Sequence, residues 1–291
     1  MSVNASTPTT NGSRRGSSAK PSFLIQKKSF AYGEHPRQRL SIYWPDEGPY
    51  PLPVVIYFHG NEFRSNNNDL SEHIQGKIGR FFVSHRIILV LASYRLLPDA
   101  KFPSGIDDVI AAIRFTKNSI RKYGGNPEEL FAMGQNAGGA HLAMALFSGH
   151  LAKQDAFPRA VMLQSAPLWY DLDQARRKRN MIEYYETEDL DKIRGWSALG
   201  LFRDRVRPDT RLPELYLSLG EWDTLEIVHG NFMFVESFMK QLAWVPKLEV
   251  LMGQSHISYA LAVGADGEEC GGRIISWIRS VLVNKPIFAE P

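Results

Sequence analysis

Three polar segments, each following an apolar run, carry residues suited to acid–base chemistry on a carbonyl compound. Gly134-Gln135-Asn136-Ala137-Gly138-Gly139 follows one such run and opens a helical pattern. Farther along the chain, Asp223 and His256 each come at the end of a later run. A carboxylate that orients an imidazole makes that imidazole a general base. The order of the segments therefore predicts a His256–Asp223 pair that acts beside residue 136.

The segment 134–139 has the strand–turn–helix context of a nucleophile elbow, whose pattern is G-x-S-x-G, but Asn136 stands at the central position. Gly134 and Gly138 suit the sharp turn, which leaves no room for a side chain on either flank. An asparagine amide is not a nucleophile, because its nitrogen shares its lone pair with the carbonyl. The amide keeps two N–H donors and one acceptor. An acyl-enzyme on residue 136 is therefore not expected.

From about Val54 to Ile278 the sequence resembles the α/β-hydrolases, in particular the hormone-sensitive-lipase-like branch near carboxylesterases and arylformamidases. The matching stretches are Tyr57-Phe-His-Gly60, Tyr94-Arg-Leu-Leu-Pro98, Phe102-Pro103, Asp107-Asp108, Tyr123-Gly-Gly-Asn-Pro127, Gly134–His141 and Gly220–Asp223.

This resemblance implies a role for each of five residues. Asp223 would be the acid of a triad and His256 its base, and the backbone amides of Ala137 and of the Gly60-Asn61 turn would form the oxyanion hole. The sequence departs from the family in two places. Its oxyanion loop reads Gly-Asn-Glu, and the nucleophilic Ser is absent.

Alternating strand and helix patterns from Phe23 onward predict an α/β-hydrolase fold, with a mostly parallel central sheet and helices on both faces. Phe23–Tyr32 and Leu40–Trp44 are expected to pair as antiparallel strands. Further strands are predicted at Pro53–Phe58, Ile87–Ser93, Leu130–Met133, Ala160–Leu163, Leu215–Leu219 and Leu248–Met252. Helices are predicted at Ser71–Ser84, Gly105–Tyr123, Ala137–Leu151, Leu225–Leu242 and Gly271–Leu282.

One domain is expected over residues 23–291, with a helical cap insertion at about 168–212 that is too long for an ordinary loop. Two interpretations of the cap aromatics, which are Trp169, Tyr184, Tyr185 and Trp196, stay open: they line a pocket, or they form the core of the cap. The basic run Arg176–Arg179 is interpreted as a solvated helix face. His141, on the helix after the elbow, is interpreted as a packed core residue.

Composition excludes several classes of protein. The 291 residues are 44% hydrophobic and 22% charged, which is too apolar for a disordered chain. A net charge of +3 and a single Cys favour neither nucleic-acid binding nor a disulfide-dependent compartment. No run is long enough to span a membrane. Residues 1–22 are polar and are expected to form a disordered tail without a secretory signal, so the cytoplasm is the default location.

Three functional hypotheses remain. In the first, His256 and Asp223 perform non-covalent acid–base catalysis on a small-to-medium carbonyl compound, with an oxyanion hole: condensation, cyclisation or cleavage of a C–C or C–O bond, as in secondary-metabolite tailoring. The second is a carboxylesterase or amidase whose Ser is altered or in which water attacks directly, with Ser165 and Ser255 interpreted as loop hydroxyls and not as nucleophiles. The third is a ligand-binding receptor without catalysis. No metal or other cofactor is expected, and a homodimer stays open.

Overall fold

The apolar runs of the sequence form one eight-stranded sheet in the computed structural model, which describes residues 23–60, 63–64, 71–265 and 269–284. The predicted tail at 1–22 and two predicted loop residues, Asn61 and Glu62, lie outside the described residues. The strands are β1 (Ile25–Ala31), β2 (Arg39–Pro45), β3 (Leu52–Phe58), β4 (Ile88–Ala92), β5 (Gly125–Gln135), β6 (Ala160–Gln164), β7 (Glu214–Trp222) and β8 (Lys247–Ser255).

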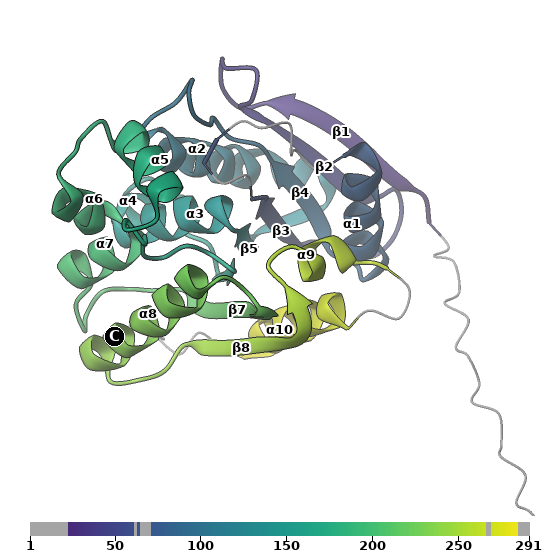
Figure 1. Cartoon of the computed structure of the whole chain (residues 1–291). Helices are drawn as coiled ribbons and strands as arrows, with labels where there is room; N and C mark the ends of the chain where they lie inside the picture. The colour runs from purple at the N-terminus through teal and green to yellow at the C-terminus, as the bar shows by residue number, and fades with distance from the viewer. Residues whose placement is uncertain (1–22, 61–62, 65–70, 266–268, 285–291) are drawn as a thin grey trace, which may run out of the picture.

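The order of the strands across the sheet is β1-β2-β4-β3-β5-β6-β7-β8 (Figure 1). β2 pairs antiparallel with β1 and with β4, whereas every pair from β4 to β8 is parallel. The predicted fold class is therefore confirmed. Because parallel strands run in one direction, the segments that follow β3, β5, β6, β7 and β8 meet at the same edge of the sheet.

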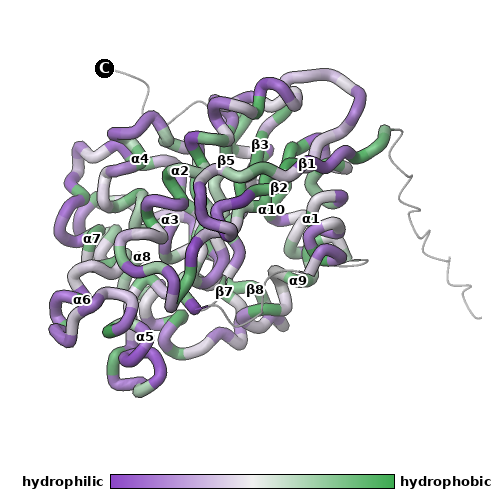
Figure 2. Tube along the Cα trace, turned by 90° about the horizontal axis from the view of Figure 1, so that it is seen from above, coloured by the Kyte–Doolittle hydropathy of each residue, from purple (hydrophilic) through white to green (hydrophobic). Residues whose placement is uncertain are grey.

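Helices cover both faces of the sheet because its central strands are apolar on both sides. Along β3, Val54, Ile56 and Phe58 pack into one core while Val55 and Tyr57 pack into the other. The first core contains α2 (Ser104–Ser119), α3 (Ala137–Phe147) and α8 (Leu225–Leu242), and the second contains α1 (Glu72–Ser84) and α10 (Cys270–Val283). Figure 2 shows hydrophobic stretches along the central strands and hydrophilic stretches on the outer turns.

The ends of two helices differ from the prediction. The helix predicted to run to Leu151 ends at Phe147, and a short helix, α4 (His150–Lys153), follows. Gly149 separates the two with a φ of 77°, a left-handed conformation that stops a helix. The helix predicted over Gly105–Tyr123 finishes as a 3₁₀ turn, and α9 (Ser258–Ala262) was not predicted.

Between β6 and β7 the chain forms three helices, α5 (Ala175–Tyr185), α6 (Leu190–Trp196) and α7 (Ala198–Arg205), which lie together at one end of the molecule (Figure 1). Tyr184 and Tyr185 are buried. Trp196 stacks against both Tyr185 and Phe102, with ring centroids 5.7 Å and 5.2 Å away, and the latter two rings also contact each other. Tyr184, Tyr185 and Trp196 therefore pack into the core beneath the cap, and Trp169 is partly buried against the same core, which supports one of the two interpretations left open.

The sequence predicted that the basic run of α5 is a solvated helix face, but one of its residues, Arg177, is largely shielded from solvent. Arg177 makes a two-pronged ion pair with Glu226 of α8, with its closest nitrogen and oxygen 2.7 Å apart. The side chains are only 16% and 10% exposed, so the pair is well protected from solvent. Since Glu226 also accepts from the backbone of Asp171, this contact fastens the cap to the helix that follows Asp223.

The elbow after β5 depends on a close approach to β3. The register places Phe58 beside Gly134, and α3 starts directly behind the end of β3. A Cβ on Gly138 would lie 2.3 Å from the carbonyl oxygen of Phe58 and 2.7 Å from that of His59. A Cβ on Gly134 would lie 2.6 Å from the Cα of Gly139. Backbone atoms cannot move aside as a flexible side chain can, so both glycines are needed.

We predict that Gly138→Ala destabilises the fold by about 1–3 kcal/mol or more, because the added methyl group overlaps a backbone carbonyl. The matched control is Gly195→Ala in α6, where an added Cβ meets nothing within 4 Å. That change should be neutral or stabilising by up to about 1 kcal/mol, since alanine favours a helix. Urea unfolding of both variants measures the difference. Equal stability of the two would contradict the close approach.

His141 is buried between the loop after β3 and the cap, as predicted for a core residue. Its ring lies 4.9 Å from that of Phe63, and its Nδ1 lies 3.5 Å from the hydroxyl of Tyr184. Burial disfavours the charged imidazole and lowers the pKa of His141 from its ordinary value of 6.5 to about 3. The residue is therefore a neutral packing group at physiological pH.

This burial predicts a specific loss of stability in acid. Between pH 6.5 and about 3 the unfolded chain binds a proton at His141 that the folded chain cannot bind, so stability falls as the pH falls. The slope is at most about 1.4 kcal/mol per pH unit for one group. His141→Gln should flatten the pH dependence of the urea midpoint in this window, whereas His229→Gln on the surface should not. An unchanged slope in the His141 variant would refute the assignment.

Candidate active site

The turn after β5 presents Asn136 in a backbone conformation that few residues adopt. Its φ is 49° and its ψ is −122°, a positive φ outside the left-handed helical region and therefore strained for any residue with a side chain. The residue is the N-cap of α3 and is 7% exposed. The turn therefore projects the Asn136 amide from the edge of the sheet where the other predicted residues meet.

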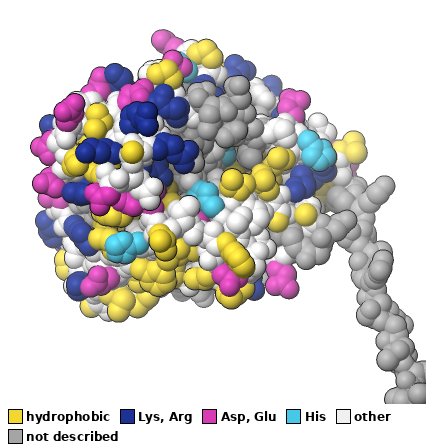
Figure 3. Space-filling model, viewed as in Figure 1, with side chains coloured by type: hydrophobic (Ala, Val, Ile, Leu, Met, Phe, Trp, Pro, Cys, Tyr) yellow, Lys and Arg dark blue, Asp and Glu magenta, His cyan; other side chains and the backbone are white. Residues whose placement is uncertain are grey.

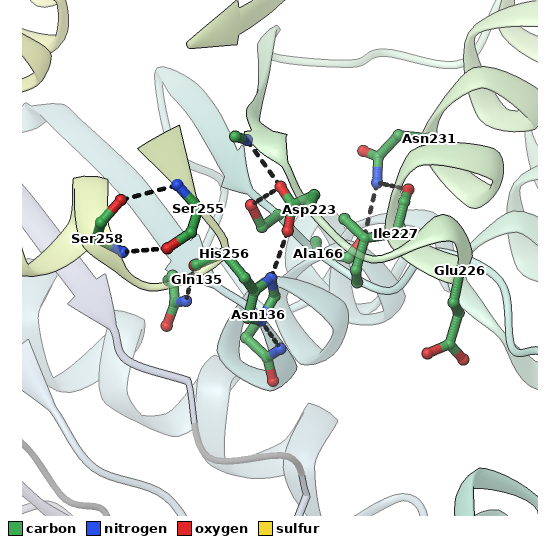
Figure 4. A network of polar contacts seen from close by, with 12 residues as sticks. Gln135, Asn136, Ala166, Asp223, Glu226, Ile227, Asn231, Ser255, His256 and Ser258 are labelled. Atoms are coloured by element: carbon green, nitrogen blue, oxygen red, sulfur yellow. Dashed lines mark hydrogen bonds and ion pairs between the residues drawn. The ribbon is translucent and has the colours of Figure 1, made fainter. Parts of the chain in front are cut away.

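His256 and Asp223 are brought together at this edge (Figure 4). His256 Nδ1 lies 2.6 Å from Asp223 Oδ1, and the Asp223 side chain is fully buried while the imidazole keeps 22% exposure. The second oxygen, Oδ2, accepts from the backbone N–H of Gly220 at 2.7 Å and from the hydroxyl of Ser165 at 2.5 Å. Because both carboxylate oxygens of Asp223 accept hydrogen bonds, the carboxylate cannot rotate. It therefore fixes the plane of the His256 imidazole.

The Asn136 amide connects the imidazole to the first backbone amide of α3. Its Oδ1 accepts from the N–H of Ala137 at 2.7 Å, and its nitrogen Nδ2 contacts His256 Nε2. A backbone N–H can only donate, so the oxygen must face Ala137 and the nitrogen must face the imidazole. Nδ2 in turn can only donate, so His256 accepts at Nε2 and carries its proton on Nδ1, toward Asp223. This is the tautomer of a general base.

Both predicted oxyanion donors that the structure describes are occupied by side-chain carbonyls. Ala137 N–H bonds to Asn136 Oδ1, and Gly60 N–H bonds to Gln135 Oε1 at 3.0 Å. The other end of Gln135 donates to the backbone oxygen of His256 at 3.2 Å, which ties the loop after β3 to the loop after β8. Asn61, the third predicted donor, lies outside the described residues. A substrate carbonyl would have to displace one of these amides.

Two residues at the site were not assigned these roles from the sequence. Ser165 contacts Asp223, on the far side from Nε2, and is therefore a positioning residue, in agreement with its interpretation as a non-nucleophile. The sequence signal for this contact is that Ser165 follows β6 and Asp223 follows the neighbouring strand β7, so both lie at the same edge of the sheet. Gln135 gave no such signal. Ser255 bonds within its own loop, to Ser258, and is exposed.

Apolar side chains stand exposed beside the polar pair. Trp222 and Leu225 flank Asp223 in the sequence and are 68% and 86% exposed, and Ile257, next to His256, is 56% exposed. Figure 3 shows hydrophobic side chains gathered in the lower middle of this face, where Figure 1 places β7, β8 and α8. Exposed apolar groups this large often mark a binding surface. They suit a ligand with an apolar part.

Metal and membrane sites were sought in the described part of the chain. There, no group of three or more His, Cys, Asp or Glu side chains is placed to hold a metal ion. Among the same residues, no helix is both long and apolar enough to cross a membrane.

Solved structures of esterases share this fold. A truncated carbohydrate esterase from gut microbiota aligns with a TM-score of 0.73 at 15% identity, covering 91% of this chain and 99% of that one. A bacterial heroin esterase aligns with a TM-score of 0.68 at 20% identity, covering 89% and 85%. At such identities the likeness concerns the fold alone.

The chain is also similar in sequence to known and probable esterases. Probable isoprenylcysteine alpha-carbonyl methylesterase ICMEL1 of Arabidopsis thaliana is 26% identical over 166 residues, 56% of this chain but only 34% of that protein. Carboxylesterase NlhH of Mycobacterium tuberculosis is 30% identical over 273 residues, which cover 86% of this chain and 81% of that protein. The BD-FAE family model matches residues 40–193, more than half of the sequence. The predicted superfamily is thus confirmed: the chain belongs to the BD-FAE family of esterase-like α/β-hydrolases.

Proposed function

We propose that this protein hydrolyses carboxylic esters of small molecules, with water activated directly by His256 and without an acyl-enzyme on residue 136. The observation that carries the proposal is the hydrogen-bonding order at the site. Asp223 holds the proton of His256 on Nδ1, so Nε2 offers its lone pair at the elbow. The relation to carboxylesterases over most of the chain supports ester hydrolysis as the reaction.

In the proposed reaction the ester displaces the Asn136 amide from Ala137 N–H. Nε2 takes a proton from water while the water oxygen bonds to the acyl carbon, and the freed N–H stabilises the carbonyl oxygen as it becomes negative. The same proton then passes from Nε2 to the departing alkoxide. Asn136, swung aside, keeps donors and an acceptor with which it can orient the ester or the water.

The comparisons favour this hypothesis over the one placed first from the sequence. The relatives and solved structures named above are esterases, and none is described as a condensing or cyclising enzyme. The acid–base role of His256 and Asp223 is retained from the first hypothesis, whereas the reaction is that of the second. The proposed substrate remains a small carbonyl compound, now an ester with an apolar part that meets Trp222, Leu225 or Ile257.

We expect His256→Ala to lower ester hydrolysis by about 10²–10⁴-fold, because the general base is removed. The assay uses a panel of p-nitrophenyl esters of increasing acyl length. His229→Ala is the matched control, since that imidazole lies on the exposed side of α8, against Trp169, and its loss should leave the rate unchanged. A rate that survives in the His256 variant would place the chemistry elsewhere. Tight binding without turnover in the unaltered protein would favour the receptor hypothesis.

Asn136→Ser should create a covalent site that the natural sequence does not have. Serine is smaller than asparagine, its hydroxyl would face Nε2, and the change frees Ala137 N–H for an oxyanion. A fluorophosphonate probe should therefore label residue 136 in the variant and not in the unaltered protein, as intact-mass and peptide mass spectrometry can show. Labelling should vanish again in the double variant with His256→Ala. A folded Ser variant without any adduct would mean that the hydroxyl and the imidazole do not align.

A further inference from the structure

We infer that Asn136 is itself a substrate of this site, and that His256 and the Ala137 amide hydrolyse its side chain to aspartate. The inference goes beyond the proposed function because it needs no bound ester. It rests on the contacts that the oxygen and the nitrogen of the Asn136 side-chain amide make. The carbonyl oxygen is held by a backbone N–H at 2.7 Å, and the nitrogen is held by the imidazole that Asp223 orients.

These are the contacts that hydrolysis of an amide requires. Charge develops on the carbonyl oxygen as water adds to the carbon, and Ala137 N–H already points at that oxygen. The departing nitrogen must gain a proton, and His256 Nε2, which accepts from that nitrogen at rest, lies where it can return to it the proton taken from water. Asn136 is only 7% exposed and its backbone is fixed as the N-cap of α3, so the carbonyl is pre-organised, whereas Nε2 must first exchange its Nδ2 donor for water.

The reaction consumes one water molecule and releases one ammonia. Water reaches the site from solvent beside the partly exposed imidazole. Its O–H replaces Asn136 Nδ2 as the hydrogen-bond donor to Nε2. Nε2 accepts the proton as the oxygen bonds to Cγ of Asn136, which gives a tetrahedral oxyanion on Oδ1. The Cγ–Nδ2 bond then breaks, Nε2 returns the proton to the nitrogen, and ammonia leaves. No group is oxidised or reduced in this reaction.

Local charge favours the product. An aspartate at position 136 would cap the N-terminus of α3, an eleven-residue helix whose first-turn N–H groups and positive dipole end favour a carboxylate there. The carboxylate would also lie beside His256 and stabilise its protonated form. A carboxylate would then lie beside each nitrogen of the His256 ring, whereas the sequence as translated places only Asp223 there.

Spontaneous deamidation would leave a different product. It proceeds through attack of the following backbone nitrogen on Cγ and gives mostly isoaspartate. Here Ala137 N is engaged as a donor to Oδ1 at the start of a helix, which opposes that attack. Hydrolysis by His256 gives normal aspartate alone. The chain also holds an internal reference, because the buried amide of Asn231 donates to the carbonyl oxygens of Ala166 and Ile227, with no imidazole bonded to it (Figure 4).

The test incubates the full-length protein in heavy-oxygen water and maps residues 136 and 231 by tandem mass spectrometry. His256→Gln removes the imidazole but keeps a polar side chain, and His229→Gln is the matched surface control. Circular dichroism confirms that each variant is folded. Asp223→Asn provides a second way to weaken the base should the His256 variant fail to fold.

We expect normal aspartate at position 136 in the unaltered protein and in His229→Gln, with one heavy oxygen when conversion occurs during the incubation. The rate should fall by about a hundredfold or more in His256→Gln. Aspartate already present at purification supports the inference equally if the His256 variant keeps asparagine. Retention of asparagine in the folded, unaltered protein would overturn it, as would isoaspartate or an equal rate in the His256 variant. Neither outcome depends on ester turnover, so this test and the esterase assay can fail separately.

Discussion

The whole site depends on one steric constraint, the contact between the backbone after β5 and the end of β3. Gly138 carries no Cβ, so α3 can begin so close to β3 that an added Cβ would lie only 2.3 Å from the Phe58 carbonyl oxygen, a distance that no side chain permits. This approach forces Asn136 into its positive φ and aims its side chain at the loop after β8. It also points the Ala137 N–H out of the helix. Without it, His256 would face no group at the elbow.

From that constraint a single chain of donors and acceptors follows, and its direction is determined by the backbone. Ala137 N–H can only donate, which orients the Asn136 amide. The amide orients the imidazole, and the imidazole proton then points at Asp223. A serine at the same place would leave the hydroxyl free to donate or accept, so the asparagine makes the hydrogen-bonding order more rigid. The amide thus preserves the general-base tautomer while it occupies the place of a nucleophile.

Much of this arrangement could be predicted from the sequence. Apolar runs between Gly and Pro residues predicted the strand ends to within three residues, because a strand buried on both faces has a strong signal, except that β5 begins at Gly125, five residues before the predicted start. The meeting of Asn136, Asp223 and His256 was predicted from their positions after strands. The contact of Asp223 with His256 was predicted as well, but the contacts that the Asn136 amide makes were not. Whether Ala137 N–H faces solvent or an adjacent side chain depends on a rotamer of Asn136, which no spacing encodes. The same holds for Gln135, whose two ends join loops 75 and 121 residues away in sequence.

The occupied donors change what catalysis at this elbow would require. Ala137 N–H can serve one carbonyl well at a time, so an external ester must compete with an amide covalently attached to the same turn. The internal amide has the advantage of proximity, since only its side-chain torsions must be ordered, whereas the ester must also lose translational freedom. Binding energy from apolar contacts such as Trp222 and Leu225 could offset that disadvantage. Ester hydrolysis and hydrolysis of Asn136 are therefore two outcomes of one competition, decided by which carbonyl holds the N–H when water reaches Nε2.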